Sequence, residues 1–172
     1  MSDAVKNVLI LCTGNSARSI LGEALINRLG EGRFRGFSAG SAPLGRVNPF
    51  AIRLLNEKGF AVEHFRSKSW DEFSNADASQ INFAFTVCDN AARETCPVWH
   101  GQPIKAHWGI PDPAAKLGTN EAKMTAFGKA YKQLEKRIRA FVALPLADLD
   151  EANLQNELNA IGRMIDGDET NV

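Results

Sequence analysis

The residues of this sequence that are best suited to chemistry begin at Cys12, which is followed after five residues by the pair Arg18-Ser19. The intervening positions, which form a short polar loop, are Thr13, Gly14, Asn15, Ser16 and Ala17. Gly14 and Asn15 tolerate left-handed backbone angles, and a turn of this kind can point successive amide N–H groups at an anion. A guanidinium at Arg18 adds a fork of charge-assisted hydrogen bonds. The pattern therefore predicts a cradle for a tetrahedral oxyanion beside a thiol.

The same positive surroundings should act on the sulfur of Cys12. Inward N–H groups, a helix N-terminus and Arg18 all favour a thiolate, so we expect a Cys12 pKa several units below the ordinary value of about 8.5. Ser19 is placed to hydrogen-bond that thiolate, and Asn15 can brace the loop through its side-chain amide. The alternative interpretation is a buried free cysteine at a strand end with a solvated arginine nearby.

A candidate general acid, Asp112, stands in the step Gly-Ile-Pro-Asp-Pro-Ala at residues 109–114. It follows the last predicted strand and should lie near the same sheet edge as Cys12, where a carboxylic acid can protonate a departing oxygen. The flanking prolines would hold it stiffly. The alternative is an aspartate that only shapes a proline-rich turn.

Two further cysteines, Cys88 and Cys96, add a possible redox function. Cys88 ends an apolar run and should share the sheet edge of Cys12, where it could form a disulfide by thiolate attack on sulfur. In an intact helix, Cys88 and Cys96 would lie about 12 Å apart at 1.5 Å per residue, whereas a disulfide tolerates roughly 7 Å between Cα atoms. Oxidation of this pair would therefore require the helix to unfold. The alternative is two buried structural thiols.

Apolar patterns predict the elements that position these residues. Strands are expected over 5–11, 34–39, 81–87 and 104–108, and helices over 17–29, from Asn48-Pro49 to Gly59, and from Thr119 to Phe141. Alternation of strands with helices predicts a three-layer α/β sandwich around a central four-stranded parallel sheet, whose ligands bind beyond the carboxyl ends of the strands. We expect a catalytic domain at 1–145 and a C-terminal helical extension at 146–172.

Composition narrows the possible partners. A chain of 172 residues fits one core, and its 20 Lys plus Arg equal its 20 Asp plus Glu, so neither nucleic acid nor a membrane surface is an expected partner. The N-terminus does not have the pattern of a signal peptide, and no apolar stretch reaches the roughly 20 residues of a membrane span, which predicts a cytoplasmic protein. The three histidines lack metal-ligand spacing, so neither a metal nor another cofactor is expected.

Three blocks carry a family resemblance. The loop CTGNSARS after an N-terminal strand resembles the phosphate-binding loop of low-molecular-weight protein tyrosine phosphatases and of the arsenate reductases that share their fold. The blocks VCDNAARETCPVWHG and HWGIPDPA resemble bacterial arsenate reductases. The resemblance implies a phosphotyrosine phosphatase I-like fold and reduction of arsenate to arsenite, through a cysteinyl-arsenic adduct on Cys12 and a relay via Cys88 and Cys96. Phosphate and sulfate are the implied analogues of arsenate.

The implied reductant is thioredoxin, which receives the disulfide along a mobile segment in such reductases, while glutathione and mycothiol stay open. Many relatives have a second cysteine where this chain has Ala17, so a protective disulfide within the loop is not expected. Glu23 and Ser38 match positions of a potassium site in some reductases of this family. Lys68 is interpreted as a solvated loop charge.

Two other functions remain open. A phosphatase would need only Cys12, Arg18 and Asp112, with water completing the hydrolysis of a phosphomonoester. Phosphatases of the resembled family usually carry aromatic residues after the Asp-Pro step, whereas Ala114 and Ala115 follow here, which favours the reductase. The third interpretation is a non-catalytic module that only binds oxyanions.

Overall fold

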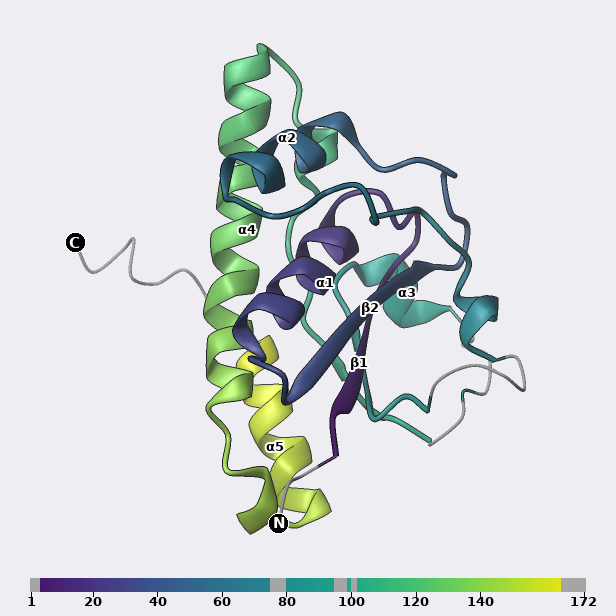
Figure 1. Ribbon diagram of the computed structural model, residues 1–172, viewed down its shortest axis with the longest axis vertical. Helices are drawn as coiled ribbons and strands as arrows, with labels where there is room; N and C mark the ends of the chain where they lie inside the picture. Colours follow the sequence, from purple (N-terminus) through teal and green to yellow (C-terminus); the bar gives the residue numbers. More distant parts are fainter. Residues whose placement is uncertain (1–3, 75–79, 95–98, 100–101, 165–172) are drawn as a thin grey trace, which may run out of the picture.

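The computed structural model describes all residues except 1–3, 75–79, 95–98, 100–101 and 165–172 (Figure 1). At its centre is a parallel sheet of four strands in the order β2-β1-β3-β4. The strands are β1 (Lys6–Cys12), β2 (Phe34–Gly40), β3 (Phe83–Thr86) and β4 (Ile104–His107). Cys12 is paired with Gly40 and Leu11 with Thr86, so the carboxyl ends of the three strands that contain them meet at one edge of the sheet. The predicted four-stranded parallel sheet is confirmed.

Helices cover one face of this sheet. They are α1 (Arg18–Leu29), α2 (Pro49–Glu57), α4 (Asn120–Val142) and α5 (Glu151–Gly162), and Figure 1 shows them together on one side. Val8 and Ile10 point from β1 into the core beneath these helices, whereas Leu9 and Leu11 point into a second core with Trp70, which begins the short 3-10 turn Trp70–Phe73. Burial on both faces explains why β1 is apolar without a two-residue period.

The predicted segments and the observed elements differ mainly near Cys88. Strand β3 is shorter than the expected 81–87, although Val87 still donates a backbone hydrogen bond to Leu11 at 2.9 Å. The following helix, α3 (Asp89–Arg93), has five residues, and Glu94 is extended with ψ 150°. The segment after Cys88 is therefore not one continuous helix, so the separation considered for an intact helix does not apply, and Cys96 itself lies outside the described residues.

The tail helix α5 packs against the rest of the fold. The Asp150 side chain accepts a hydrogen bond from the Asn153 N–H at 2.7 Å and caps its N-terminus. The buried indole of Trp108 donates from Nε1 to the carbonyl of Leu158 at 3.0 Å, and Arg137 on α4 donates to another tail carbonyl at 2.8 Å. A division between a catalytic domain ending at 145 and a helical extension stays a prediction. No helix in the described part of the chain is long and apolar enough to cross a membrane.

Candidate active site

The nucleophile loop, residues 12–19, connects the end of β1 to the start of α1. Three of its carbonyls, those of Thr13, Gly14 and Ser16, accept backbone hydrogen bonds of 2.8–3.0 Å from the segment 42–48. A Cβ at Gly40 would collide with the Thr13 carbonyl, so a glycine is required where β2 ends beside the loop. Because these carbonyls face outward, the loop can turn its N–H groups inward, as the predicted anion cradle requires.

Asn15 fixes the shape of the loop. It is fully buried and has a left-handed φ of 46°, a conformation that asparagine adopts more readily than most residues. Its Nδ2 donates to Ser19 Oγ at 2.8 Å, and its Oδ1 accepts from the Lys68 backbone N–H at 2.8 Å. Ser19 Oγ lies 2.9 Å from Cys12 Sγ. The two side chains therefore occupy the bracing and thiol-contacting positions that the sequence predicts for them.

The thiol of Cys12 is buried, with 4% of the residue exposed. This burial raises the Cys12 pKa above its ordinary value, while hydrogen bonds from the Ser19 side chain and from the Ser19 and Asn15 backbones act to lower it. The expected pKa several units below 8.5 is therefore wrong in direction for the free loop, because desolvation of the thiolate outweighs its hydrogen bonds. The sulfur of Cys88 adds a repulsion that also raises the pKa, so the two thiols are close enough to interact.

Arg18 and Asp112 lie beside each other at the mouth of the loop. Arg18 Nη2 is 3.6 Å from Asp112 Oδ2, and Arg18 Nη1 donates to the Ile110 carbonyl at 3.0 Å. The other oxygen of Asp112 accepts from the Ala114 N–H at 2.9 Å, which holds the carboxyl at the start of a short turn. Ala17 is the N-cap of α1 and its methyl side chain provides no cap, so no capping side chain competes with an anion for the first N–H groups of the helix.

Cys88 begins the relay segment, which we define as residues 88–96 and which the structure describes as far as Glu94. Its sulfur accepts a hydrogen bond from the Ala91 N–H at 3.4 Å, as the N-cap of α3. Thr13 Oγ1 of the nucleophile loop is 3.6 Å from the same sulfur. The structure therefore brings Cys88 to the loop of Cys12, whereas the position of Cys96 falls outside the described residues.

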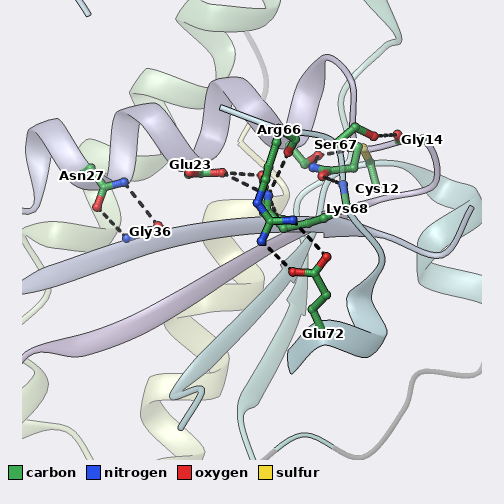
Figure 2. Close-up of polar contacts among 12 residues, drawn as sticks. Cys12, Gly14, Glu23, Asn27, Gly36, Arg66, Ser67, Lys68 and Glu72 are labelled. Atoms are coloured by element: carbon green, nitrogen blue, oxygen red, sulfur yellow. Dashed lines mark hydrogen bonds and ion pairs between the residues drawn. The ribbon is translucent and has the colours of Figure 1, made fainter. Parts of the chain in front are cut away.

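Sequence reasoning missed two features of the site. The first is His107 at the end of β4, whose ring nitrogens lie 2.7 Å from Thr86 Oγ1 and 2.9 Å from Asp89 Oδ1. The second is the support of the nucleophile loop by Ser67, whose hydroxyl donates to the Gly14 carbonyl at 3.1 Å, and by its neighbour Lys68 (Figure 2). No local pattern signals either contact, because the partners are distant in the sequence.

The interpretation of Lys68 as a solvated charge is wrong. Its side chain is 9% exposed, and Nζ lies 2.8 Å from the Ser38 carbonyl and 3.9 Å from Glu23 Oε1. Glu23 itself accepts a hydrogen bond from Ser38 Oγ at 2.5 Å. A potassium ion does not fit between Glu23 and Ser38 here, since an ammonium already contacts both residues. In the described ranges, no group of three or more His, Cys, Asp or Glu side chains is arranged to hold a metal ion.

Comparison with known proteins agrees with this geometry. Residues 7–158 match the family model described as low molecular weight phosphotyrosine protein phosphatase. A protein from Halalkalibacterium halodurans named arsenate reductase is 32% identical over 136 residues, which are 79% of this chain and 94% of that protein. A crystal structure of arsenate reductase from Archaeoglobus fulgidus superposes with a TM-score of 0.62 at 28% identity, covering 80% of this chain and 99% of the other. An arsenate reductase in a phosphate-binding state gives a TM-score of 0.60 at 28% identity, covering 78% and 97% of the two chains.

Proposed function

Since this chain belongs to the low molecular weight phosphotyrosine protein phosphatase family, we propose that it reduces arsenate to arsenite, with Cys12 as the nucleophile. The observation that carries the proposal is the second thiol beside the nucleophile loop, with Cys88 Sγ at 3.6 Å from Thr13 Oγ1. Hydrolysis of a phosphate ester needs no such thiol, whereas reduction needs a source of two electrons. The arsenate reductases among its relatives support the same choice.

In the first step, Cys12 attacks arsenic from within the cradle. Loop N–H groups and Arg18 bind the arsenate oxygens, and the Cys12 thiol passes its proton to the bound anion as the sulfur attacks. A sulfur–arsenic bond forms and an arsenic–oxygen bond breaks. Asp112 protonates the departing oxygen, which leaves as water. The product is a cysteinyl-arsenic adduct in which arsenic is still pentavalent.

The second step moves the electrons. The Cys88 thiolate attacks Cys12 Sγ, forms a disulfide and breaks the sulfur–arsenic bond, whose electron pair remains on arsenic and gives arsenite. Cys96 then attacks Cys88 and regenerates the Cys12 thiol. An external dithiol such as thioredoxin reduces the resulting Cys88–Cys96 disulfide. Each turnover therefore uses two electrons from the thiol partner, and a cycle of this kind belongs in a reducing compartment such as the cytoplasm.

The second candidate function is hydrolysis of a phosphomonoester through a cysteinyl-phosphate on Cys12. The family match favours it, because Cys12, Arg18 and Asp112 suffice for that reaction. Two features of this chain disfavour it. Ala114 and Ala115, which follow the acid, are exposed and provide no aromatic wall for a phenyl ring, and Cys88 would have no role.

The test compares the two thiols in two reactions. Arsenate-dependent oxidation of NADPH, coupled through thioredoxin and its reductase, is measured beside hydrolysis of an aryl phosphate for the wild type, Cys12→Ser and Cys88→Ser. We expect Cys12→Ser to lose both reactions, and Cys88→Ser to lose arsenate reduction while keeping any ester hydrolysis. A Cys88→Ser protein that reduces arsenate at the wild-type rate would overturn the proposal. Ester hydrolysis without any arsenate-dependent oxidation would establish the second candidate.

A further inference from the structure

A buried ammonium, that of Lys68, lies between Glu23 and the nucleophile loop in the view of Figure 2. Lys68 Nζ faces four oxygen atoms from three residues, at 2.8 Å from the Ser38 carbonyl, 3.0 Å from the Arg66 carbonyl, 3.5 Å from Ser38 Oγ and 3.9 Å from Glu23 Oε1. The side chains of Lys68 and Glu23 are only 9% and 12% exposed. Carbonyl, hydroxyl and carboxylate oxygens around one positive charge are also the surroundings that hold a dehydrated potassium ion.

Burial makes this charge pair costly. Desolvation raises the Glu23 pKa and lowers the Lys68 pKa, so both shifts oppose the charged forms, even though each group acts on the other to favour its charge. An apolar pair of similar volume would often be as stable or more so. A gain in stability therefore does not explain why Lys68 and Glu23 are buried as a charged pair at this position.

Lys68 connects to the nucleophile through a chain of short hydrogen bonds. Its backbone N–H donates to Asn15 Oδ1 at 2.8 Å, Asn15 Nδ2 donates to Ser19 Oγ at 2.8 Å, and Ser19 Oγ lies 2.9 Å from Cys12 Sγ. The Lys68 carbonyl accepts from the Gly40 N–H at 2.9 Å, which anchors the same peptide to the end of β2. Holding the ammonium in place therefore also holds the backbone donor that orients Asn15.

We propose that Lys68 is a positioning residue whose ammonium is a built-in monovalent cation for the nucleophile loop, so that the oxyanion cradle of this chain forms without potassium. The ammonium ties the carbonyls of Ser38 and Arg66 and the carboxylate of Glu23 to one centre. Asn15 is then held in its left-handed conformation and the loop N–H groups stay turned toward the anion. The inference rests on the proposed role of the loop as an oxyanion site and is independent of whether arsenate is reduced there.

The test uses sulfate as the probe, so that no reductase activity is needed. The sulfate concentration that halves the rate of Cys12 alkylation by iodoacetamide is measured in choline chloride and in potassium chloride at equal ionic strength. The proteins are the wild type, Lys68→Ala, Lys68→Met and Lys129→Ala, in which an exposed lysine of α4 is removed as the matched control. Thermal unfolding in the same two salts reports whether each variant is folded.

We expect the wild type and Lys129→Ala to bind sulfate equally in both salts. Lys68→Ala should bind sulfate about tenfold more weakly in choline chloride, corresponding to about 1.4 kcal/mol, and potassium should restore most of the affinity. Lys68→Met should be weakened to a similar extent in both salts, because its side chain fills the space that a cation would enter. Restoration by a cation of the right size separates this role from a merely structural one.

Three results would overturn the inference. They are a wild type whose sulfate affinity rises with potassium, a folded Lys68→Ala protein that matches the wild type in choline chloride, and a weakened Lys68→Ala protein whose affinity potassium does not restore. If Lys68→Ala unfolds in choline chloride, its unfolding midpoint must rise with potassium while that of Lys68→Met does not. Cation rescue in a protein that fails to reduce arsenate would contradict only the proposed function.

Discussion

The nucleophile loop and the relay segment lie at the same sheet edge but are held very differently. Three carbonyls of the loop accept backbone hydrogen bonds from the segment 42–48, and the buried side chain of Asn15 makes two further hydrogen bonds. The described part of the relay segment has one five-residue helix, and its outer contacts are made by exposed side chains, such as Asp89 with His107 and Glu94 with Ser41. Local stability is therefore expected to be high in the loop and low in the described part of the segment.

This difference matches what the two regions have to do in the proposed cycle. The loop must present a fixed set of donors to a tetrahedral anion, and preorganised donors stabilise a transition state because they need not reorganise. The relay segment must bring the thiol of Cys88 to the sulfur of Cys12 and must then pass the disulfide on to Cys96. A short helix capped by the reacting cysteine itself is suited to that movement, because attack by Cys88 removes the cap that its sulfur gives to Ala91.

Among substitutions outside the cysteines, the largest effect is expected at Asp112, which lies beside the nucleophile loop. Asp112→Asn keeps the size of the side chain but removes the proton donor for the departing oxygen. We expect arsenate turnover to fall about 10²-fold, with little change in the sulfate affinity of the loop. Steady-state kinetics combined with sulfate protection of Cys12 measures both quantities. Unchanged turnover would show that Asp112 only shapes its turn.

A smaller effect, with a defined pH dependence, is expected for Ser19→Ala. Burial raises the Cys12 pKa and the Ser19 side chain opposes that rise, so removing the hydroxyl should raise the pKa further. For the wild type, the iodoacetamide alkylation rate should increase with pH and reach its midpoint above the ordinary value of about 8.5. For Ser19→Ala the midpoint should move up further, and the alkylation rate at neutral pH should fall about tenfold, as expected for the loss of one hydrogen bond to a charged sulfur. A midpoint that stays or falls would contradict this account of the thiol.

The smallest effect is expected in the relay segment away from its cysteines. Asp89→Ala removes the contact of α3 with His107 on β4, and an exposed pair of this kind contributes less than about 1 kcal/mol. Hydrogen exchange of α3 should become faster while that of the nucleophile loop is unchanged, and turnover should change by about twofold at most. A loss as large as that of Asp112→Asn would show that the relay segment needs a fixed geometry after all.

Parts of the site differ in how far the sequence could predict them. The nucleophile loop could be recognised because strand, turn and helix are consecutive, and Asp112 and Cys88 could be placed because parallel strands end at one sheet edge. Ser67 and Lys68 could not, since each contacts a loop residue 53 positions away in the sequence. A lysine is also rarely buried, so its residue type pointed to solvent.

The Cys12 pKa was predicted in the wrong direction for a related reason. The local motif contains every feature that favours a thiolate, and the Ser19 and Asn15 hydrogen bonds are present. The burial that outweighs them comes from packing between distant elements, which no local pattern reports. The end of α3 was likewise not predictable from the sequence, because small and polar residues permit a helix without determining where it ends.

In the proposed cycle, Cys12 and Cys88 exchange a sulfur–arsenic bond for a disulfide. The most direct test of this exchange is mass spectrometry of Cys96→Ser after incubation with arsenate in the absence of reductant, followed by alkylation of the remaining thiols. Without the third cysteine the cycle should stop at a Cys12–Cys88 disulfide, formed only when arsenate is present, with one arsenite released per chain. If Cys12 and Cys88 are instead recovered fully alkylated while the wild type reduces arsenate, the account is contradicted.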